Sequence, residues 1–301
     1  MTPPLGVALT GHWLSLGAVL RLAARADELG YALVLVDGDS SAARPDPGRP
    51  VHDATALAAA TALATQRARL GSIRFAHFWN PVLLARSLAT LQELAGGRWL
   101  SVFGVGAPRH SGRVGLPEES AAERVARLDE TLAMVRALLA GETVAQRGRF
   151  AVLDGARIMP PSVKTPIVVS AAGPRALDVV RRHADVWDAN VPPLRARLAP
   201  LRAKLARALP TWLWVFARPG AGRDEAVTHY RRHAPWFADL SDDEAGQAVL
   251  WGDTARCLER LARIRDELDV ALPIVDLAGL DEAAAERALA ALAGAGVTRI
   301  P

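Results

Sequence analysis

The chain has 301 residues, half of them hydrophobic, and carries a net charge of +4 with a pI near 9.9. Arginine makes up 34 of its 36 basic residues, and these are scattered among acidic ones, which argues against a nucleic-acid-binding patch. A single cysteine excludes an intramolecular disulfide, and neither a signal-peptide pattern nor an apolar run long enough for a membrane span is visible, so we expect a cytoplasmic protein without membrane contact.

Hydrophobic periodicity predicts that short strands alternate with amphipathic helices. The expected strands are residues 5–9, 31–36, 69–76, 99–105, 167–169, 185–189, 212–216 and 272–277. The expected helices are residues 16–29, 53–65, 81–94, 118–139, a helix that begins at Pro174, 195–207, two within 218–250, 254–267 and 282–292. Residues 141–165 interrupt this alternation, and we expect a hairpin there, around residues 150–153.

Eight strands that alternate with helices imply parallel pairing through right-handed crossovers. Such a chain closes into a (β/α)8 barrel, an α/β fold that here would span residues 1–301 as one domain. An open, doubly wound sheet is the alternative. The turn after the first strand, residues 10–16, lacks the G-x-G-x-x-G pattern of that fold, so we favour the barrel.

The junction between the fifth strand and the next helix has the composition of a phosphate-binding turn. The strand passes into the helix through four small residues, Ser170, Ala171, Ala172 and Gly173. Small side chains let a ligand approach the backbone, and the amides of the first helical turn point at it. Pro174 suits the first helical position, and Arg175 adds a charge that can pair with an anion. The alternative is an ordinary helix start, because many helices begin with Gly-Pro.

Six segments, among them AARADELGYALVLVDG and the turn SAAGPR, carry a resemblance to a known family. They are residues 23–38, 54–72, 80–108, 123–142, 148–188 and 251–264. In this order they resemble the bacterial-luciferase-like family of flavin- and deazaflavin-dependent oxidoreductases. The resemblance implies the same barrel, with reduced FMN or a deazaflavin coenzyme across the carboxyl ends of the strands and its phosphate on the turn Ser170 to Arg175. It also implies a homodimer.

The same resemblance suggests further site residues in the loops after the strands. Family members often use a histidine after the first or third strand, which makes His12 and His77 the catalytic candidates. The remaining cofactor-binding candidates are Asp37, Ala76, Asn80, Gly104 and Gly106. The family often has a strained, cis non-proline peptide near Ala76. Asn80 can equally be the cap of the next helix, and the two glycines can equally belong to a plain turn.

Other polar and aromatic residues have simpler interpretations. Asp188 and Asn190 follow the sixth strand and so belong to the same rim. His229 and His233 share a helix face, but no H-E-x-x-H pattern or third ligand accompanies them, so we expect no metal. Tryptophans in the last third of the chain are expected in the core or the rim, with one or two as an apolar substrate wall.

Three functions remain open. The first is a monooxygenase that takes reduced FMN from a partner flavin reductase, reacts it with oxygen, and oxygenates a small organic substrate. The second is a deazaflavin-dependent reductase or dehydrogenase on the same barrel. The third is a barrel that binds a flavin or metabolite without turnover. It is suggested by Asp37-Gly38-Asp39 and Ala107-Pro108-Arg109, which stand where many relatives have a histidine and a glutamate, respectively.

Overall fold

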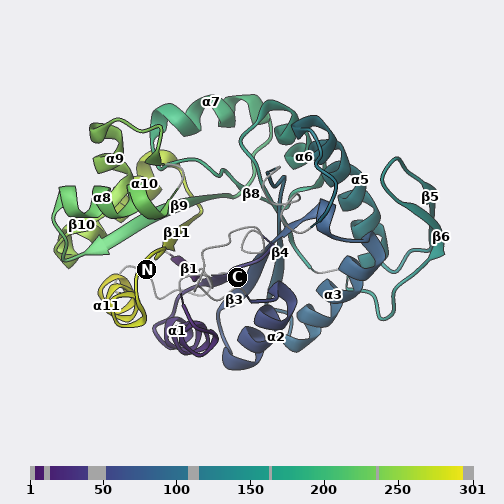
Figure 1. The fold of residues 1–301 in the computed structure, drawn as a ribbon, viewed down its shortest axis with the longest axis horizontal. Helices are drawn as coiled ribbons and strands as arrows, with labels where there is room; N and C mark the ends of the chain where they lie inside the picture. Colours follow the sequence, from purple (N-terminus) through teal and green to yellow (C-terminus); the bar gives the residue numbers. More distant parts are fainter. Residues whose placement is uncertain are drawn as a thin grey trace.

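The fold is known from a computed structural model that describes residues 4–9, 14–39, 52–107, 115–162, 165–234 and 237–293. In these residues eight parallel strands close into a barrel, because β8 pairs with β7 on one side and with β9 on the other (Figure 1). The barrel strands are β1 (Gly6–Leu9), β2 (Leu33–Val36), β3 (Arg69–Phe75), β4 (Trp99–Gly104), β7 (Ile167–Ser170), β8 (Val186–Asp188), β9 (Thr211–Pro219) and β11 (Leu272–Asp276). The predicted barrel is confirmed.

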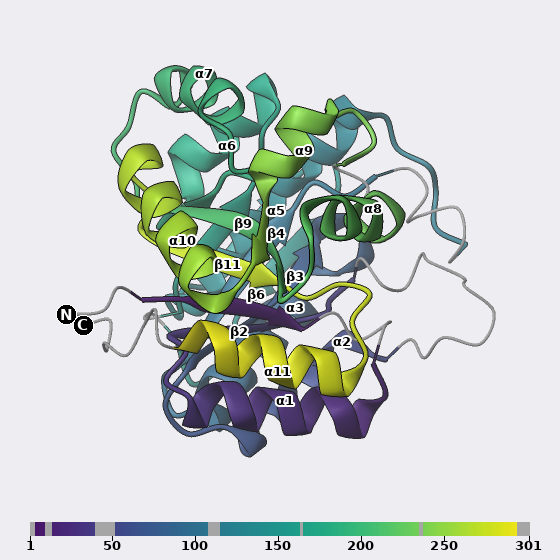
Figure 2. The ribbon, with the colours of Figure 1, turned by 90° about the vertical axis from the view of Figure 1, so that its left-hand side faces the viewer.

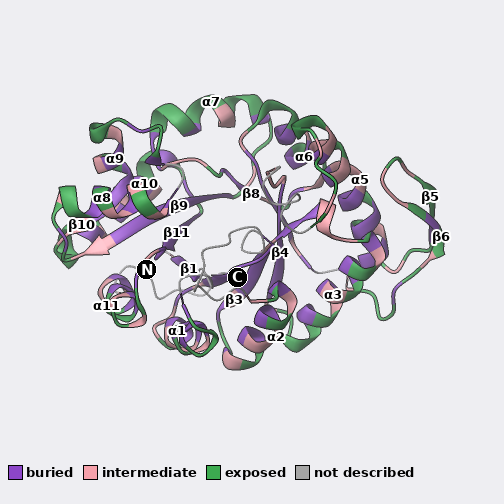
Figure 3. Ribbon diagram, viewed as in Figure 1, coloured by how far each residue is buried: buried purple, intermediate pink, exposed green. Residues whose placement is uncertain are grey.

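Helices form the outer ring and turn their apolar sides toward the strands, as the buried inner and exposed outer faces in Figure 3 show. They are α1 (Leu16–Glu28), α2 (Ala54–Ala64), α3 (Pro81–Leu94), α5 (Ala121–Leu139), α6 (Pro174–His183), α7 (Arg195–Leu205), α10 (Thr254–Leu268) and α11 (Glu282–Leu292). None of the described helices is long and apolar enough to cross a membrane.

Two packed cores hold the barrel together. Inside the barrel, inward-facing side chains from alternate strand positions pack together, among them Leu33, Leu100, Trp212 and Leu272. A larger cluster fills the space between the strands and the helices. β1 lies between β2 and β11, and outside it α1 and α11 run side by side (Figure 2), joined by a bidentate ion pair from Arg21 to Glu282 at 2.6 and 2.8 Å.

The excursion before β7 is the hairpin that was predicted, formed by β5 (Val144–Arg147) and β6 (Val152–Ala156). The segment after β9 holds the two expected helices, α8 (Arg223–His233) and α9 (Asp242–Ala248). It also holds a strand that was not predicted, β10 (Val249–Gly252), which pairs in parallel with the C-terminal residues of β9. β10 is short and follows α9 directly, so its few residues show no period of their own.

The chain beyond β3 differs from the expectation taken from the family. The peptide bonds from Phe75 to His77 are trans, and residues 76–78 form a short 3-10 helix, η2 (Ala76–Phe78). A buried carboxylate holds this turn, because Asp39 Oδ2 accepts hydrogen bonds from the Phe75 amide at 2.8 Å and the Trp79 indole N–H at 2.7 Å. The expected cis peptide is therefore wrong for this structure.

Candidate active site

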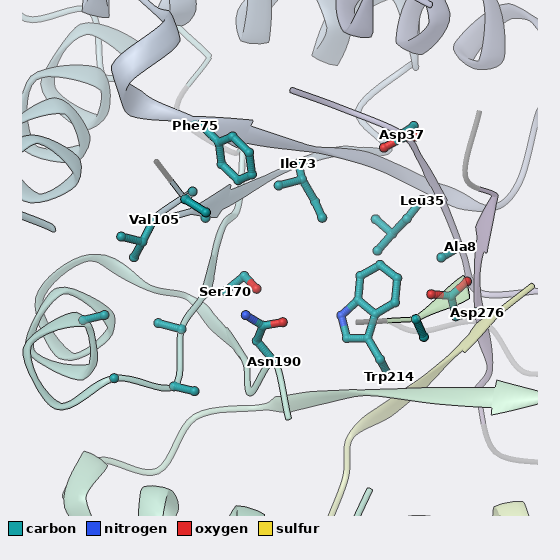
Figure 4. Close-up of a pocket in the computed structure, with 18 of the residues that line it drawn as sticks. Ala8, Leu35, Asp37, Ile73, Phe75, Val105, Ser170, Asn190, Trp214 and Asp276 are labelled. Carbon is teal, nitrogen blue, oxygen red and sulfur yellow. The ribbon is translucent and has the colours of Figure 1, made fainter. Parts of the chain in front are cut away.

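A cavity of about 980 Å³ opens at the carboxyl ends of the barrel strands. This volume lies at the upper end of the range of sites that bind cofactors and other small molecules. Figure 4 shows Leu35, Ile73 and Phe75 along one side of the cavity and Trp214 on another, with Ser170 and Asn190 between them. The charged or ionisable residues among the described lining residues are Asp37, Arg175, His233, Asp239 and Asp276. The cavity is thus lined mainly by apolar residues, with a few polar groups among them.

The turn from Ser170 to Arg175 lies along this cavity, and all six of its residues line it. The N-cap of α6 is Gly173, and no described side chain caps the helix there. A Cβ built on Gly173 would meet no described atom within 4 Å, so the space beside the turn is open. The first amides of a helix have no acceptor within the helix. The turn therefore offers unshared N–H donors, the positive end of a helix dipole and the Arg175 guanidinium to an anion.

Gly104 and Gly106 also line the cavity, but protein side chains already crowd them. A Cβ on Gly104 would lie 2.8 Å from the Phe75 ring, and one on Gly106 would lie 2.5 Å from the His77 ring. Gly106 has a φ of +71°, a conformation that favours glycine. Glycine is needed at both positions because the Phe75 and His77 rings lie against them. The two glycines had been predicted to bind the cofactor, whereas the close contacts seen here are with protein side chains.

His77 lies behind the cavity wall and is not among the described lining residues. Its ring stacks on Phe75 at a centroid distance of 5.7 Å and meets the edge of Phe78 at 4.6 Å. Burial lowers the pKa of His77 to about 4, so the ring is neutral at pH 7. Its Nε2 is buried with no hydrogen-bond partner in the described part of the chain. This geometry lends the predicted catalytic role of His77 no support.

The other predicted residues divide between the cavity and its surroundings. Asp37 lines the cavity, and its Oδ1 accepts the Gly38 amide at 3.0 Å. Ala76 is buried in η2, away from the described cavity lining. Asn80 caps α3, accepting hydrogen bonds from the amides of Val82 at 2.9 Å and Leu83 at 3.3 Å, which is its simpler interpretation. His12 lies outside the described residues.

A buried carboxyl, Asp188, lies beneath this site at the end of β8 and is 0% exposed. Its two oxygens each lie 3.1 Å from Trp214 Nε1, and its Oδ1 accepts the Asn190 amide at 3.2 Å. It also shares a hydrogen bond with the Ser170 side chain. Burial raises the pKa of Asp188 to about 6 although these hydrogen bonds favour the charged form.

This raised pKa predicts a stability difference that depends on pH. Between the ordinary value of 3.8 and about 6, folded Asp188 binds a proton that the unfolded chain releases, so its contribution to stability is complete at low pH and falls as pH rises. Relative to an Asp188→Asn variant, the wild type should lose about 2.4 kcal/mol of unfolding free energy between pH 4 and pH 7. Urea unfolding of both proteins across this range measures it, and a constant difference would contradict the raised pKa.

Sequence reasoning missed the place of two lining residues, His233 and Asp276. Asp276 is the last residue of β11, just as Asp188 is the last residue of β8. A polar residue at the end of the last barrel strand could therefore have been recognised in the sequence as a residue of the rim. His233 was considered only with His229 as a metal ligand. In the structure the His229 Nε2 lies 2.8 Å from the Ala278 carbonyl oxygen, and the described residues contain no cluster of three or more metal-binding groups. Trp214 is the tryptophan that forms an apolar wall, and Trp236 lies outside the described residues.

Known proteins share both the sequence pattern and the fold. The F420-dependent glucose-6-phosphate dehydrogenase of Nakamurella multipartita is 30% identical over 195 residues, covering 62% of this chain and 56% of that protein. The corresponding enzyme of Beutenbergia cavernae is 35% identical over 129 residues, covering 42% and 38%. The F420-dependent hydroxymycolic acid dehydrogenase of Mycobacterium tuberculosis is 28% identical over 186 residues, covering 60% and 48%. These matches thus span between 38% and 56% of the relatives' own lengths.

Solved structures of similar fold include both a dehydrogenase and a monooxygenase. An F420-dependent secondary alcohol dehydrogenase, solved with an F420-acetone adduct, has a TM-score of 0.81 at 17% identity and covers 98% of this chain and 100% of that one. A monooxygenase from Streptomyces bottropensis has a TM-score of 0.75 at 20% identity, with coverages of 97% and 98%. The model of the luciferase-like monooxygenase family matches residues 4–210. The chain therefore belongs to the luciferase-like monooxygenase family.

Proposed function

We propose that the chain is an oxidoreductase that transfers a hydride between a deazaflavin of the F420 type and a small organic substrate. The observation that carries the proposal is the uncapped N-terminus of α6 opening on an apolar cavity at the strand ends. The relatives named above favour a deazaflavin over FMN, because three of them are F420-dependent dehydrogenases. The deazaflavin-dependent function, which was the second hypothesis from the sequence, is therefore preferred here to the FMN-dependent monooxygenase, which was the first.

The residues present fit such a cofactor at both of its ends. Gly173 leaves open space beside the amides of α6, so a phosphate would meet N–H donors and the Arg175 guanidinium without steric conflict. Apolar side chains, among them Ile73 and Phe75, would pack against the ring system. When bound, the deazaflavin supplies a ring carbon that accepts or donates a hydride.

The chain itself must handle the proton of the substrate. When an alcohol carbon gives up a hydride, its hydroxyl proton needs an acceptor within hydrogen-bond reach. Among the acidic and histidine residues that line the cavity, Asp239 is exposed, whereas Asp37, His233 and Asp276 are buried or half-buried and are available for this role. We place the acceptor among these three residues and not at His77, whose ring lies behind Gly106 and Phe75.

A monooxygenase that uses reduced FMN is the second candidate. It is favoured by the fold shared with the Streptomyces bottropensis monooxygenase and other solved monooxygenases. It would use the same phosphate turn, so the turn does not separate the two functions. The chemical difference lies in the ring, because reduced FMN reacts with oxygen whereas a deazaflavin is restricted to hydride transfer.

Parallel titrations of the purified protein with F420, FMN and anaerobically reduced FMN separate these functions. We expect F420 to bind more tightly than either form of FMN. The loaded protein should then reduce F420 with a secondary alcohol from a substrate panel, seen as loss of the oxidised cofactor's absorbance. Preferential binding of reduced FMN with substrate-dependent oxygen uptake would establish the monooxygenase instead. Binding of F420 without turnover of any substrate would favour the third hypothesis, a barrel that binds its ligand without catalysis.

A further inference from the structure

One carboxyl organises three lining residues of the cavity although it is not itself among the described residues that line it. Asp188 is fully buried at the end of β8. It contacts Ser170 from β7, Trp214 from β9 and Asn190 from the turn that follows β8. These three residues line the cavity and come from three separate segments, so a single side chain fixes their relative positions.

The contact with Trp214 is the most directional of the three. The indole N–H has both carboxylate oxygens within 3.1 Å, so rotating the ring about its bond to Cβ would break both contacts. Figure 4 shows the indole beside the cavity with its nitrogen on the side of Ser170 and Asn190. The bond to Asp188 therefore sets which part of the indole faces the cavity.

The contact with Asn190 shapes the backbone of the rim. Asp188 Oδ1 accepts the amide two residues further on, an arrangement that stabilises a turn. Asn190 has a φ of +50° in this turn, a conformation that a non-glycine residue seldom adopts. The turn brings the Asn190 side chain to the cavity, where Figure 4 shows it next to Ser170.

Stability alone does not explain a carboxyl at this position. An apolar side chain of similar size would fill the same buried space without the cost of desolvating an ionisable group. The hydrogen bonds that offset this cost all go to residues of the cavity or its rim. The benefit of the carboxyl is therefore the orientation of those residues.

We propose that Asp188 is a positioning residue that acts chiefly through Trp214, holding the indole in the orientation that the ring system of the cofactor requires. This inference rests on the proposed function, because the ring that packs near Trp214 is that of the bound deazaflavin. It predicts that most of the effect of Asp188 on cofactor affinity disappears when the indole N–H is removed. The carboxyl does not touch the cofactor and takes no part in the reaction.

A double-mutant cycle between Asp188 and Trp214 tests the proposal. Asp188→Leu removes every acceptor and should weaken F420 binding about tenfold, whereas Asp188→Asn keeps an oxygen for the indole and should recover most of the affinity. Trp214→Phe removes the N–H, so adding Asp188→Leu to it should change the affinity by less than about twofold. Equal losses in the two backgrounds would overturn the proposal.

A second measurement, near-ultraviolet circular dichroism without cofactor, separates this proposal from the proposed function. Asp188→Leu should alter the tryptophan bands of the wild type and leave those of the Trp214→Phe protein unchanged. If wild type binds neither F420 nor FMN, the proposed function fails, and the spectra alone decide whether Asp188 holds the indole. Identical spectral changes in both backgrounds would overturn the proposal. If the leucine variant does not fold, Asp188→Ala, which also removes both oxygens, gives the same comparison.

Discussion

Gly173→Asp is expected to make the protein slightly more stable while weakening cofactor binding by about a hundredfold. Gly173 has a φ of −76° and open space around its Cβ position, so an aspartate fits without strain. Its carboxylate would cap α6 and interact with the helix dipole, adding roughly 0.5–1 kcal/mol to the unfolding free energy. The same carboxylate would occupy the phosphate position and repel the phosphate charge, which removes several charge-assisted hydrogen bonds.

A matched control exists at the start of α8. Gly222 is also an N-cap glycine with an extended backbone, and no described side chain caps the helix there. A Cβ built on it would meet no described atom within 4 Å. Unlike Gly173, it is not among the described residues that line the cavity. Gly222→Asp should therefore stabilise the protein without affecting affinity. Thermal unfolding and F420 titration of both variants measure the two effects. Wild-type affinity in Gly173→Asp would place the phosphate away from α6.

Asp39→Asn is expected to lower the unfolding free energy by about 3–5 kcal/mol, because it removes the main counter-charge of a buried cation. Arg74 is 0% exposed, and its Nη1 lies 3.6 Å from Asp39 Oδ1. Burial raises the pKa of Asp39 and lowers the pKa of Arg74, and the attraction between the two charges opposes both shifts. Asparagine keeps an oxygen for the Phe75 amide and the Trp79 indole, so the substitution removes mainly the charge.

The Arg74→Met background shows whether the ion pair causes this loss. Methionine fills much of the same space without a charge, so Asp39→Asn should there cost less than about 1 kcal/mol. Urea unfolding at pH 7 of the wild type, the two single variants and the double variant gives the coupling energy directly. A loss of the same size in both backgrounds would assign the effect to the hydrogen bonds of the η2 turn instead of the charge.

The parts of this fold that could be predicted are those determined by short stretches of sequence. Asn80-Pro81 marks the start of α3, and α2, which Asp53 caps, lies within the helix predicted at residues 53–65. The alternation of buried strands with amphipathic helices was enough for the barrel, and the small residues from Ser170 onward indicated a turn that proves to line the cavity. Each of these signals lies within a few residues of the feature that it predicts.

The parts that could not be predicted depend on contacts between distant segments. His77 follows β3 as a rim residue would, but only the positions of Phe75 and Gly106 show that its ring lies behind the cavity wall. The pairing of Asp188 with Trp214 joins adjacent strands through an indole whose direction no local pattern specifies. The choice between FMN and a deazaflavin is equally hidden, because either cofactor would present a phosphate to the same proposed turn.

The closure of the barrel has a consequence for its synthesis on the ribosome. One edge of β1 pairs with β2 early in the chain, but the other pairs with β11, which is translated only after all the other barrel strands. Until then the nascent chain exposes an unpaired strand edge, the kind of surface that chaperones protect. Asp276, at the end of β11, reaches the cavity at that same last step. Acquisition of ligand binding during translation would therefore report the moment at which the barrel closes.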